Sequence, residues 1–440
     1  MAKFSTDLPD LEEMMKNMPP TKLSSKRPPN NRFAQFKGVQ EAFASDPMRC
    51  GGCGAKVGST TVSRVLQYVY QRQVQRAAAR NLSAPSPIDH DDAAVIPLDS
   101  KNGVGTAALI QTIDYFRELL PDPYVFGKIV AVHALSDVHA MGGATAQTAL
   151  TLAVVPFCAD EAMTEATLIQ LLSGVSDVLQ DEGVQLVGGH TCEGSELACG
   201  LSVQGFTSDA TNLLWRKRGG RVGDQIVLTK PLGTGALFAA DMRAKARGEF
   251  VAEAIQSMTV SNIHASRIAM EHAKHVHACT DVTGFGLVGH LLEMLMANEK
   301  QKGLESIGAV LNISNIPFLR GGLQASSHGI FSTLQPQNAN NRRAVVNHNR
   351  AAEAFPVEYP LLFDPQTAGG LLFFVSPDGC DALLSQLQTL DQTASSTAVI
   401  GEIVAYPEPC GQQSLIQGAG AVCTIGSGET VTGQRIRISW

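Results

Sequence analysis

Apolar and polar positions change their period repeatedly along the first half of the chain, and these changes predict alternating helices and strands. Ser59 or Thr60 can cap a helix, and apolar residues recur at helical spacing from Val62 to Tyr70. Short apolar runs predict strands at 93–96, 107–113, 148–155, 185–187 and 200–206. Longer periodic stretches predict helices at 124–141, which Gly142 would end, and at 161–180.

A second alternating series begins near Gly223. Here we predict strands at 225–229, 371–375 and 397–403, and helices from 236 onward and at 261–275, 287–296 and 378–387, with a loop at 280–286. Strands that alternate with helices throughout indicate an α/β or layered α+β protein, divided near residue 208.

The length of 440 residues favours two domains rather than one core. We expect an N-terminal domain at 49–207 and a C-terminal domain at 208–440. Residues 1–48 are polar, contain two Pro-Pro pairs and show little periodicity, so we expect a disordered linker or tail there.

Composition narrows the class of protein. A net charge of −7 argues weakly against nucleic acid as the main partner, and no apolar run approaches the ~18–20 residues needed to cross a membrane. The first 31 residues lack the apolar core of a secretion signal. The nine cysteines are odd in number and widely spread, which is a poor disulfide framework and predicts a cytoplasmic protein.

The segment CGGCGAK at 50–56 combines a thiol and an ammonium three residues apart, at Cys53 and Lys56, on a backbone rich in glycine. A positive charge about 4 Å from a thiol lowers the thiol pKa and favours the nucleophilic thiolate. Two other interpretations stay open: a redox C-x-x-C pair, or two small buried residues.

Aspartates form the second chemical pattern. Asp91 and Asp92 precede the strand at 93–96, Asp114 follows the strand at 107–113, and Asp137 lies on a largely apolar helix. Asp281 lies in a later acidic motif. Carboxylates of this kind hold Mg²⁺ against the phosphates of a nucleotide. The alternative for each aspartate is the cap of a helix or turn.

The sequence GGHT at 188–191 follows an apolar strand and could present backbone N–H groups to phosphate. The chain contains no G-x-x-x-x-G-K-[ST] motif, so it is not a P-loop protein. KPLGTG at 230–235 and TGFGLVG at 283–289 read as tight turns that open helices, and close packing explains them as well as ligand contact does.

Eight segments, taken in order, resemble selenophosphate synthetase, also called selenide, water dikinase. They are GCGAK (52–56), DDAAV (91–95), TIDYF (112–116), ALSDVHAMGG (134–143), GGHT (188–191), LTKPLGTG (228–235), TDVTGFGLVGH (280–290) and DPQTAGG (364–370). The resemblance covers about 50–403. It implies an aminoimidazole ribonucleotide synthetase-like fold of two α/β halves, in which the N-terminal half forms a barrel with a second copy in a homodimer.

The resemblance also implies an enzyme that converts ATP, selenide and water to selenophosphate, AMP and phosphate and that requires Mg²⁺. By position, Cys53 matches the catalytic cysteine and Lys56 the essential lysine, which also lies near the nucleotide. The magnesium ligands match Asp92, Asp137 and Asp281, with Asp137 also near the nucleotide. The nucleotide contacts match Asp91, Asp114, Gly189, His190 and Thr191.

Two departures matter. Ala55 stands where some relatives carry a second cysteine, so a cysteine pair here would join Cys50 to Cys53. Residues 1–48 are similar to the linker found where this enzyme is fused behind a flavin-dependent NADH dehydrogenase-like domain. We therefore expect a fragment or trimmed descendant of such a fusion.

Two other functions are open at this point. One is a different ATP-using enzyme of the same superfamily, such as a thiamine phosphate kinase or a purine-pathway ligase, which would not need Cys53. The other is a non-enzymatic selenium or zinc carrier that uses Cys50 and Cys53, which would leave the aspartates unexplained.

Overall fold

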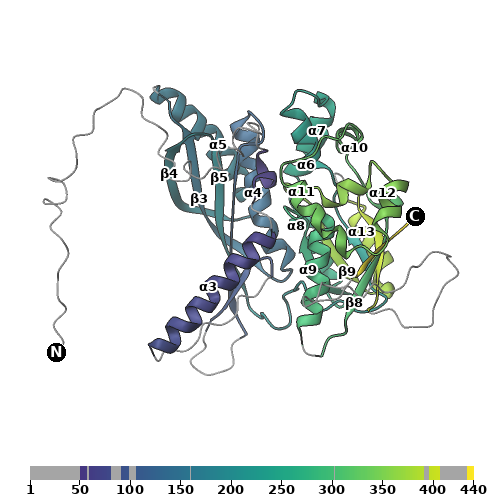
Figure 1. The fold of residues 1–440 in the computed structure, drawn as a ribbon. Helices are drawn as coiled ribbons and strands as arrows, with labels where there is room; N and C mark the ends of the chain where they lie inside the picture. Colours follow the sequence, from purple (N-terminus) through teal and green to yellow (C-terminus); the bar gives the residue numbers. More distant parts are fainter. Residues whose placement is uncertain are drawn as a thin grey trace. The chain divides into compact units, whose positions relative to one another are not determined.

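Two β-sheets organise the structure, one built from residues 94–207 and the other from 225–439 (Figure 1). The computed structural model describes residues 50–56, 59–80, 91–98, 106–158, 160–301, 303–390, 396–406 and 434–440. The linker predicted at 1–48 and its fusion junction lie outside these residues. Within the described part, no helix has both the length and the apolar character needed to cross a bilayer.

The first sheet has five strands in the order β1-β2-β5-β3-β4. They are β1 (Ala94–Pro97), β2 (Ala108–Arg117), β3 (Thr145–Pro156), β4 (Gln185–Gly194) and β5 (Ala198–Thr207). Only β3 and β4 pair in parallel. The sheet follows η2 (Gly52–Ala55) and α3 (Ser59–Ala79). A helix forms here as predicted, but it already includes Ser59 and Thr60, the predicted caps, and continues beyond Tyr70.

Helix α4 (Pro123–Ala140) is the central helix of the described part, and α5 (Glu161–Asp181) packs beside it. The Asp122 side chain caps α4 by accepting from the N–H groups of Tyr124 and Val125, and Gly142 follows its end with φ of +70°. α4 contacts β2 and β5 on one side and α7, α8 and β7 on the other. Its apolar side chains therefore point in nearly all directions, as expected for a helix buried all round.

The second sheet has six strands in the order β11-β8-β10-β6-β9-β7. They are β6 (Gln225–Leu228), β7 (Val276–Asp281), β8 (Ile307–Asn312), β9 (Leu371–Val375), β10 (Ala398–Ala405) and β11 (Ile436–Ser439). Around them are α6 (Thr234–Asp241), α7 (Gly248–Thr259), α8 (Ile263–Glu271), α9 (Gly286–Lys300), α10 (Arg320–Ser327), α11 (Gln335–Asn338), α12 (His348–Ala354) and α13 (Pro377–Leu387). Three 3₁₀ helices complete this half: η3 (Ile313–Asn315), η4 (Ala339–Ala344) and η5 (Tyr359–Phe363).

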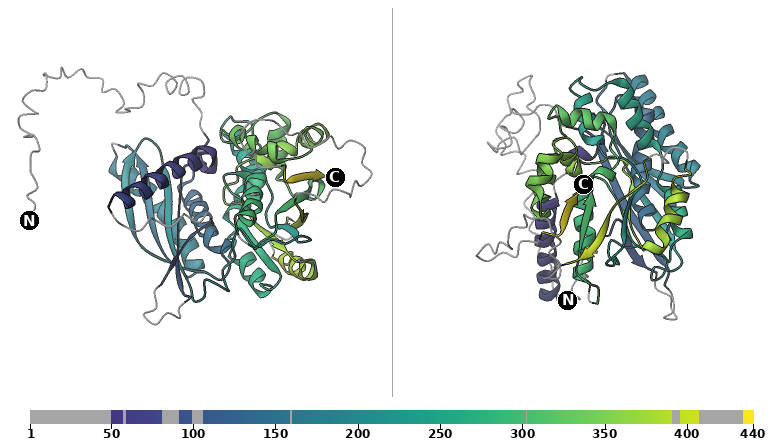
Figure 2. Two further views of the ribbon diagram at one scale, coloured as in Figure 1. Left: turned by 60° about the horizontal axis from the view of Figure 1, so that its bottom comes forward. Right: turned by 90° about the vertical axis from the view of Figure 1, so that its right-hand side faces the viewer.

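The two sheets differ in how their faces are covered (Figure 2). Every residue of β9 is buried, and β7 is buried over nearly its whole length. The first sheet buries one face under α4 and α5 but leaves the other open, with Ile113 65% and Leu150 41% exposed. Along β2, exposed residues on the open face alternate with buried residues on the covered face, which is the period of two expected for a half-buried strand.

Most predicted elements are confirmed, including β9 at its predicted bounds, but three elements have other bounds than predicted and the turn at GGHT is wrong. The strand predicted at 107–113 extends through Asp114, and GGHT is not a turn because β4 continues through it beside β3. A bulge in the β3–β4 pairing near Gly188 lets the strand absorb the two glycines. The loop predicted at 280–286 begins inside β7, and α8 is shorter than the helix predicted at 261–275.

Candidate active site

Three aspartates from distant parts of the sequence meet in the described structure. Asp92 lies two residues before β1, Asp137 lies on α4 and Asp281 is the last residue of β7. One carboxylate oxygen from each lies within 4.8 Å of the others. They meet because α4 packs directly against β7. We call Asp92, Asp137 and Asp281 the aspartate cluster.

Burial and mutual repulsion act on this cluster. Burial, together with Asp114, Asp281 and Asp92, raises the pKa of Asp137 well above its usual range. Burial also raises the pKa of Asp92 to about 6, although Lys217 opposes the shift. The buried Oδ2 of Asp281 has no hydrogen-bond partner among the described residues. The cluster therefore carries negative charge that its neighbours compensate only in part, and its carboxylates fit a divalent metal by donor type and spacing.

The sequence analysis did not identify a basic segment, residues 216–218, that lies beside the aspartate cluster. Lys217 Nζ lies 3.0 Å from Asp92 Oδ1 and 3.0 Å from Glu293 Oε2. The side chain of Arg216 and the backbone N–H of Lys217 donate to the two oxygens of Asp91, at 2.9 and 3.1 Å. Asp91 therefore anchors this segment rather than joining the aspartate cluster. The run Arg216-Lys217-Arg218 is the sequence signal that could have indicated it.

Cys53 and Lys56 lie in a second group, which we call the cysteine cluster: Cys53, Lys56, Asp114 and His133. Cys53 is fully buried in η2, and its Sγ lies 3.5 Å from His133 Nε2. Lys56 Nζ donates to Asp114 Oδ1 at 3.1 Å, and Asp114 Oδ2 lies 3.5 Å from His133 Nε2. Burial opposes ionisation of the Cys53 thiol, but His133 and Lys56 outweigh it and lower its pKa.

His133 is the member of the cysteine cluster that sequence reasoning missed. It lies on α4, four residues before Asp137, so the two side chains project from one face of the helix. The sequence signal that could have identified His133 is its position one helical turn before Asp137, a candidate metal ligand.

The DPQTAGG segment at 364–370 holds the cysteine cluster in place. Thr367 Oγ1 accepts the Cys53 N–H at 3.1 Å, and the Ala368 N–H donates to His133 Nδ1 at 2.9 Å. Asp364 and Gln366 accept from N–H groups at the start of α6. The segment therefore connects the start of the described chain to its C-terminal half through backbone and side-chain hydrogen bonds.

The predicted contacts Gly189, His190 and Thr191 lie apart from Asp114 of the cysteine cluster. Along the sheet, Asp114 pairs with Leu201, Leu201 with Thr151, and Thr151 with Gly189. Three strand spacings of ~4.8 Å put Gly189 about 14 Å from Asp114. The GGHT residues are exposed on the edge strand β4.

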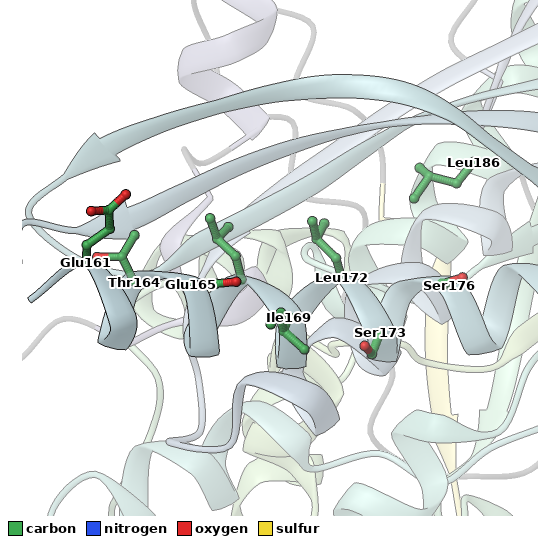
Figure 3. Close-up of a pocket in the computed structure, with 9 residues that line it drawn as sticks. Glu161, Thr164, Glu165, Ile169, Leu172, Ser173, Ser176 and Leu186 are labelled. Atoms are coloured by element: carbon green, nitrogen blue, oxygen red, sulfur yellow. The ribbon is translucent and has the colours of Figure 1, made fainter.

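A surface groove of about 640 Å³ lies elsewhere, between α5 and β4 (Figure 3). Its lining is mostly apolar, with Leu168, Ile169, Leu172 and Leu186 among its residues, and its acidic groups are Glu161 and Glu165. Two carboxylates with no basic side chain in the lining disfavour a phosphate ligand. The groove is therefore a poor nucleotide site.

The fold and this site define an enzyme of the AIR synthase related class. The family model "AIR synthase related protein, N-terminal domain" matches residues 90–207, and the model of the C-terminal domain matches 221–409. A thiamine-monophosphate kinase structure from Stenotrophomonas maltophilia superposes with a TM-score of 0.51 at 16% identity, covering 75% of this chain and 92% of that one. A HypE–HypF complex gives a TM-score of 0.50 at 13% identity, covering 72% and 87%.

Curated relatives narrow the class further. Selenide, water dikinase of Bdellovibrio bacteriovorus is 33% identical over 80% of this chain and 93% of the relative. The enzyme of the same name from Agathobacter rectalis is 36% identical over 77% and 90%. This chain belongs to the selenide, water dikinase family.

Proposed function

We propose that this protein transfers the γ-phosphoryl group of ATP to selenide, forming selenophosphate. Water then cleaves the remaining ADP to AMP and orthophosphate. The observation that supports this function most directly is the junction of a cysteine cluster with an aspartate cluster. A phosphoryl-transfer enzyme needs the second cluster, and selenium chemistry accounts for the first.

Lys56 is the link between the two clusters. Burial opposes the charge on its ammonium, but Cys53, Asp114 and, to a smaller extent, Asp137 of the aspartate cluster outweigh burial and raise the pKa of Lys56. Lys56 therefore keeps its charge at any working pH, as a group that stabilises phosphoryl oxygens must. A Cβ on Gly284 would lie 2.8 Å from Lys56 Cδ, so glycine there leaves room for the lysine.

Asp92, Asp137 and Asp281 would hold Mg²⁺. When bound, Mg²⁺ neutralises charge on the phosphate oxygens of ATP. The unpartnered Asp281 Oδ2 and the pKa of Asp137, which burial and neighbouring carboxylates raise, support this assignment, because a cation would stabilise both carboxylates.

The remaining roles follow from position. Cys53 would present or activate selenium for attack on the γ-phosphorus, and Lys56 would steer that phosphoryl group. Asp114 would place Lys56 through their ion pair, and Asp91 would place the basic residues Arg216 and Lys217 near the nucleotide. Gly189, His190 and Thr191 would contact the nucleotide from the exposed edge of β4, outside the two clusters.

We further propose a homodimer through the open face of the first sheet. Ile113, Tyr115 and Leu150 expose apolar surface there, and Tyr68 and Val69 do so on α3. Apolar surface of this kind is covered in stable oligomers. Ile113→Asp should convert a dimer to a monomer in light scattering. Met163→Asp, which changes a 59% exposed residue on α5, should leave the dimer intact.

A cytoplasmic location also belongs to the proposal. The seven described cysteines are all free thiols, and a reducing compartment would keep them so.

Anaerobic ³¹P NMR of the protein with ATP, Mg²⁺ and selenide tests the reaction, with a sample lacking selenide as the control. We expect selenophosphate, AMP and orthophosphate to appear together only when selenide is present. Formation of ADP alone would contradict the proposal, and so would selenide-independent release of AMP.

A further inference from the structure

His133 is fully buried and has a partner at each ring nitrogen. Nδ1 lies 2.9 Å from the backbone nitrogen of Ala368, and Nε2 lies 3.5 Å from Cys53 Sγ. A backbone N–H only donates, so Nδ1 must offer a lone pair. The proton of the neutral ring therefore resides on Nε2, which becomes a donor.

Two acceptors compete for the Nε2 proton. Cys53 Sγ and Asp114 Oδ2 both lie 3.5 Å from Nε2. That distance is beyond the usual 2.7–3.2 Å range for a nitrogen–oxygen hydrogen bond, whereas the larger radius of sulfur makes it an ordinary contact. Asp114 is also engaged by Lys56 at 3.1 Å. The geometry therefore directs the proton to sulfur.

The backbone that fixes the tautomer of His133 is itself strained. Ala368 has φ of +50°, a left-handed conformation that is unfavourable for a residue with a Cβ atom. Its carbonyl accepts from the buried Lys230 Nζ at 3.1 Å, and the next carbonyl, of Gly369, accepts from Asn262 at 2.9 Å. The fold thus holds the Ala368 peptide in an unfavourable conformation that points its N–H at His133.

We propose that His133 is a positioning residue, which holds the Cys53 sulfur as a thiolate by donating the Nε2 proton while the Ala368 N–H occupies Nδ1. This inference rests on the proposed function only in taking Cys53 as the reactive sulfur. His133 is then not the base that deprotonates Cys53, because its single lone pair is already bound. The titratable groups that face Cys53 are Lys56 from its own segment, Asp114 from β2 and the neutral His133 from α4.

The test is a pH titration of thiolate ultraviolet absorbance, taking the difference between each protein and its Cys53→Ser counterpart to remove the other cysteines. We expect His133→Leu, which removes the donor and keeps the bulk, to lower the thiolate fraction of Cys53 at neutral pH by about tenfold or more. His133→Gln should recover part of the effect, because its amide nitrogen can still donate to sulfur.

His139→Leu is the matched control. His139 lies on the same helix, is also buried and pairs with Glu182 at 2.9 Å, away from Cys53. Its loss should lower the melting temperature and leave the Cys53 titration unchanged. An unshifted titration in folded His133→Leu, or an equal shift in His139→Leu, would overturn the proposal.

A second measurement does not depend on a variant folding. The ¹⁵N spectrum of the unaltered protein should show His133 protonated at Nε2 and unprotonated at Nδ1. A proton on Nδ1 would refute the inference. Neither measurement uses ATP or selenide, so failure of the proposed reaction would not be mistaken for failure of this inference.

Discussion

The cysteine cluster and the aspartate cluster share α4 but differ in how well this chain satisfies them. In the cysteine cluster, each polar side-chain atom described above has a partner: Lys56 with Asp114, and His133 with both Cys53 and Ala368. In the aspartate cluster, a buried oxygen of Asp281 has no hydrogen-bond partner within the described residues, and the pKa of Asp137 is raised.

This difference indicates that the fold preorganises the cysteine cluster, whereas the aspartate cluster depends on a bound cation. The fold organises the sulfur, its donor and the lysine before any substrate arrives, so their geometry costs little during the reaction. The carboxylates instead carry mutual repulsion that Lys217 relieves only at Asp92 and that a bound cation would relieve further, which couples metal binding to stability. Substitutions in the two clusters should therefore have separable effects.

Cys53→Ser should give the largest effect. Because a hydroxyl is far less acidic and less nucleophilic than a thiol, we expect selenide-dependent turnover to fall by about 10³-fold or more, while ATP still binds. Cys50→Ser is the control, since Cys50 packs in an apolar cluster with residues such as Ala236. Loss of ATP binding in Cys53→Ser, measured by calorimetry, would assign Cys53 a structural role instead.

Asp137→Asn should affect stability in the opposite directions with and without metal. In EDTA the melting temperature should rise, by about 2 °C, because one of three repelling carboxylates loses its charge. With Mg²⁺ at about 100 times its dissociation constant, the unaltered protein should gain about 2.7 kcal/mol, and the variant should lose most of that gain. An equal Mg²⁺-induced shift in both proteins, measured by calorimetry, would place the metal elsewhere.

The metal-free protein should lose stability as pH rises through about 6. The folded-state pKa of Asp92, about 6, is above its ordinary value of 3.8, so the folded state binds more protons between these values. This contribution is fully present below pH 3.8 and disappears as pH passes the folded pKa. Chemical denaturation in EDTA at several pH values should show the decline, and saturating Mg²⁺ should reduce it. A slope unaffected by Mg²⁺ would separate Asp92 from the metal site.

Gly52→Ala should loosen the cysteine cluster without touching the aspartates. Gly52 has φ of +55°, and a Cβ there would lie 2.6 Å from Thr367 Oγ1, so we expect a loss of about 1–2 kcal/mol and faster alkylation of Cys53. Gly183→Ala is matched to it, with φ of +76° and nothing within 4 Å of the new Cβ. The control should show strain alone, with Cys53 still protected. Equal alkylation rates in both would contradict the contact.

Glu293→Gln should give the smallest effect. Glu293 is paired with Lys217 at 3.0 Å, but its side chain is 36% exposed, so solvent screens the pair and we expect a loss below about 1 kcal/mol. Lys217 lowers the pKa of Glu293 to about 2 against burial, so this stability is present above pH 4.5 and is lost as pH falls toward 2. The Mg²⁺-induced shift should persist, because Lys217 still holds Asp92. Its disappearance would extend the metal site to Glu293.

Much of the architecture could be predicted from local patterns. The helical periodicity of α4 and the apolar run of β9 depend on neighbouring residues, and both elements formed where the sequence indicated. The sequence pattern did not predict strand β7. This strand is buried on both faces and ends in polar Thr280 and Asp281, so its apolar and polar residues do not alternate. The prediction of a turn at GGHT was wrong because two adjacent glycines are typical of a turn, whereas pairing with β3 keeps these residues in a strand.

The sequence by itself determined the family and the residue types of the chemistry: the thiol, the lysine and the aspartates, each within a short motif. Only the tertiary structure decided which of them meet. Asp91 accepts a hydrogen bond from Arg216, and GGHT lies on the edge strand β4. His133 and Thr367 contact Cys53 from positions far apart in the chain. The physical reason is that a short motif reflects the conformation of its own backbone. The hydrogen-bond partners, burial and pKa values of the site residues depend instead on how α4 packs between the two sheets.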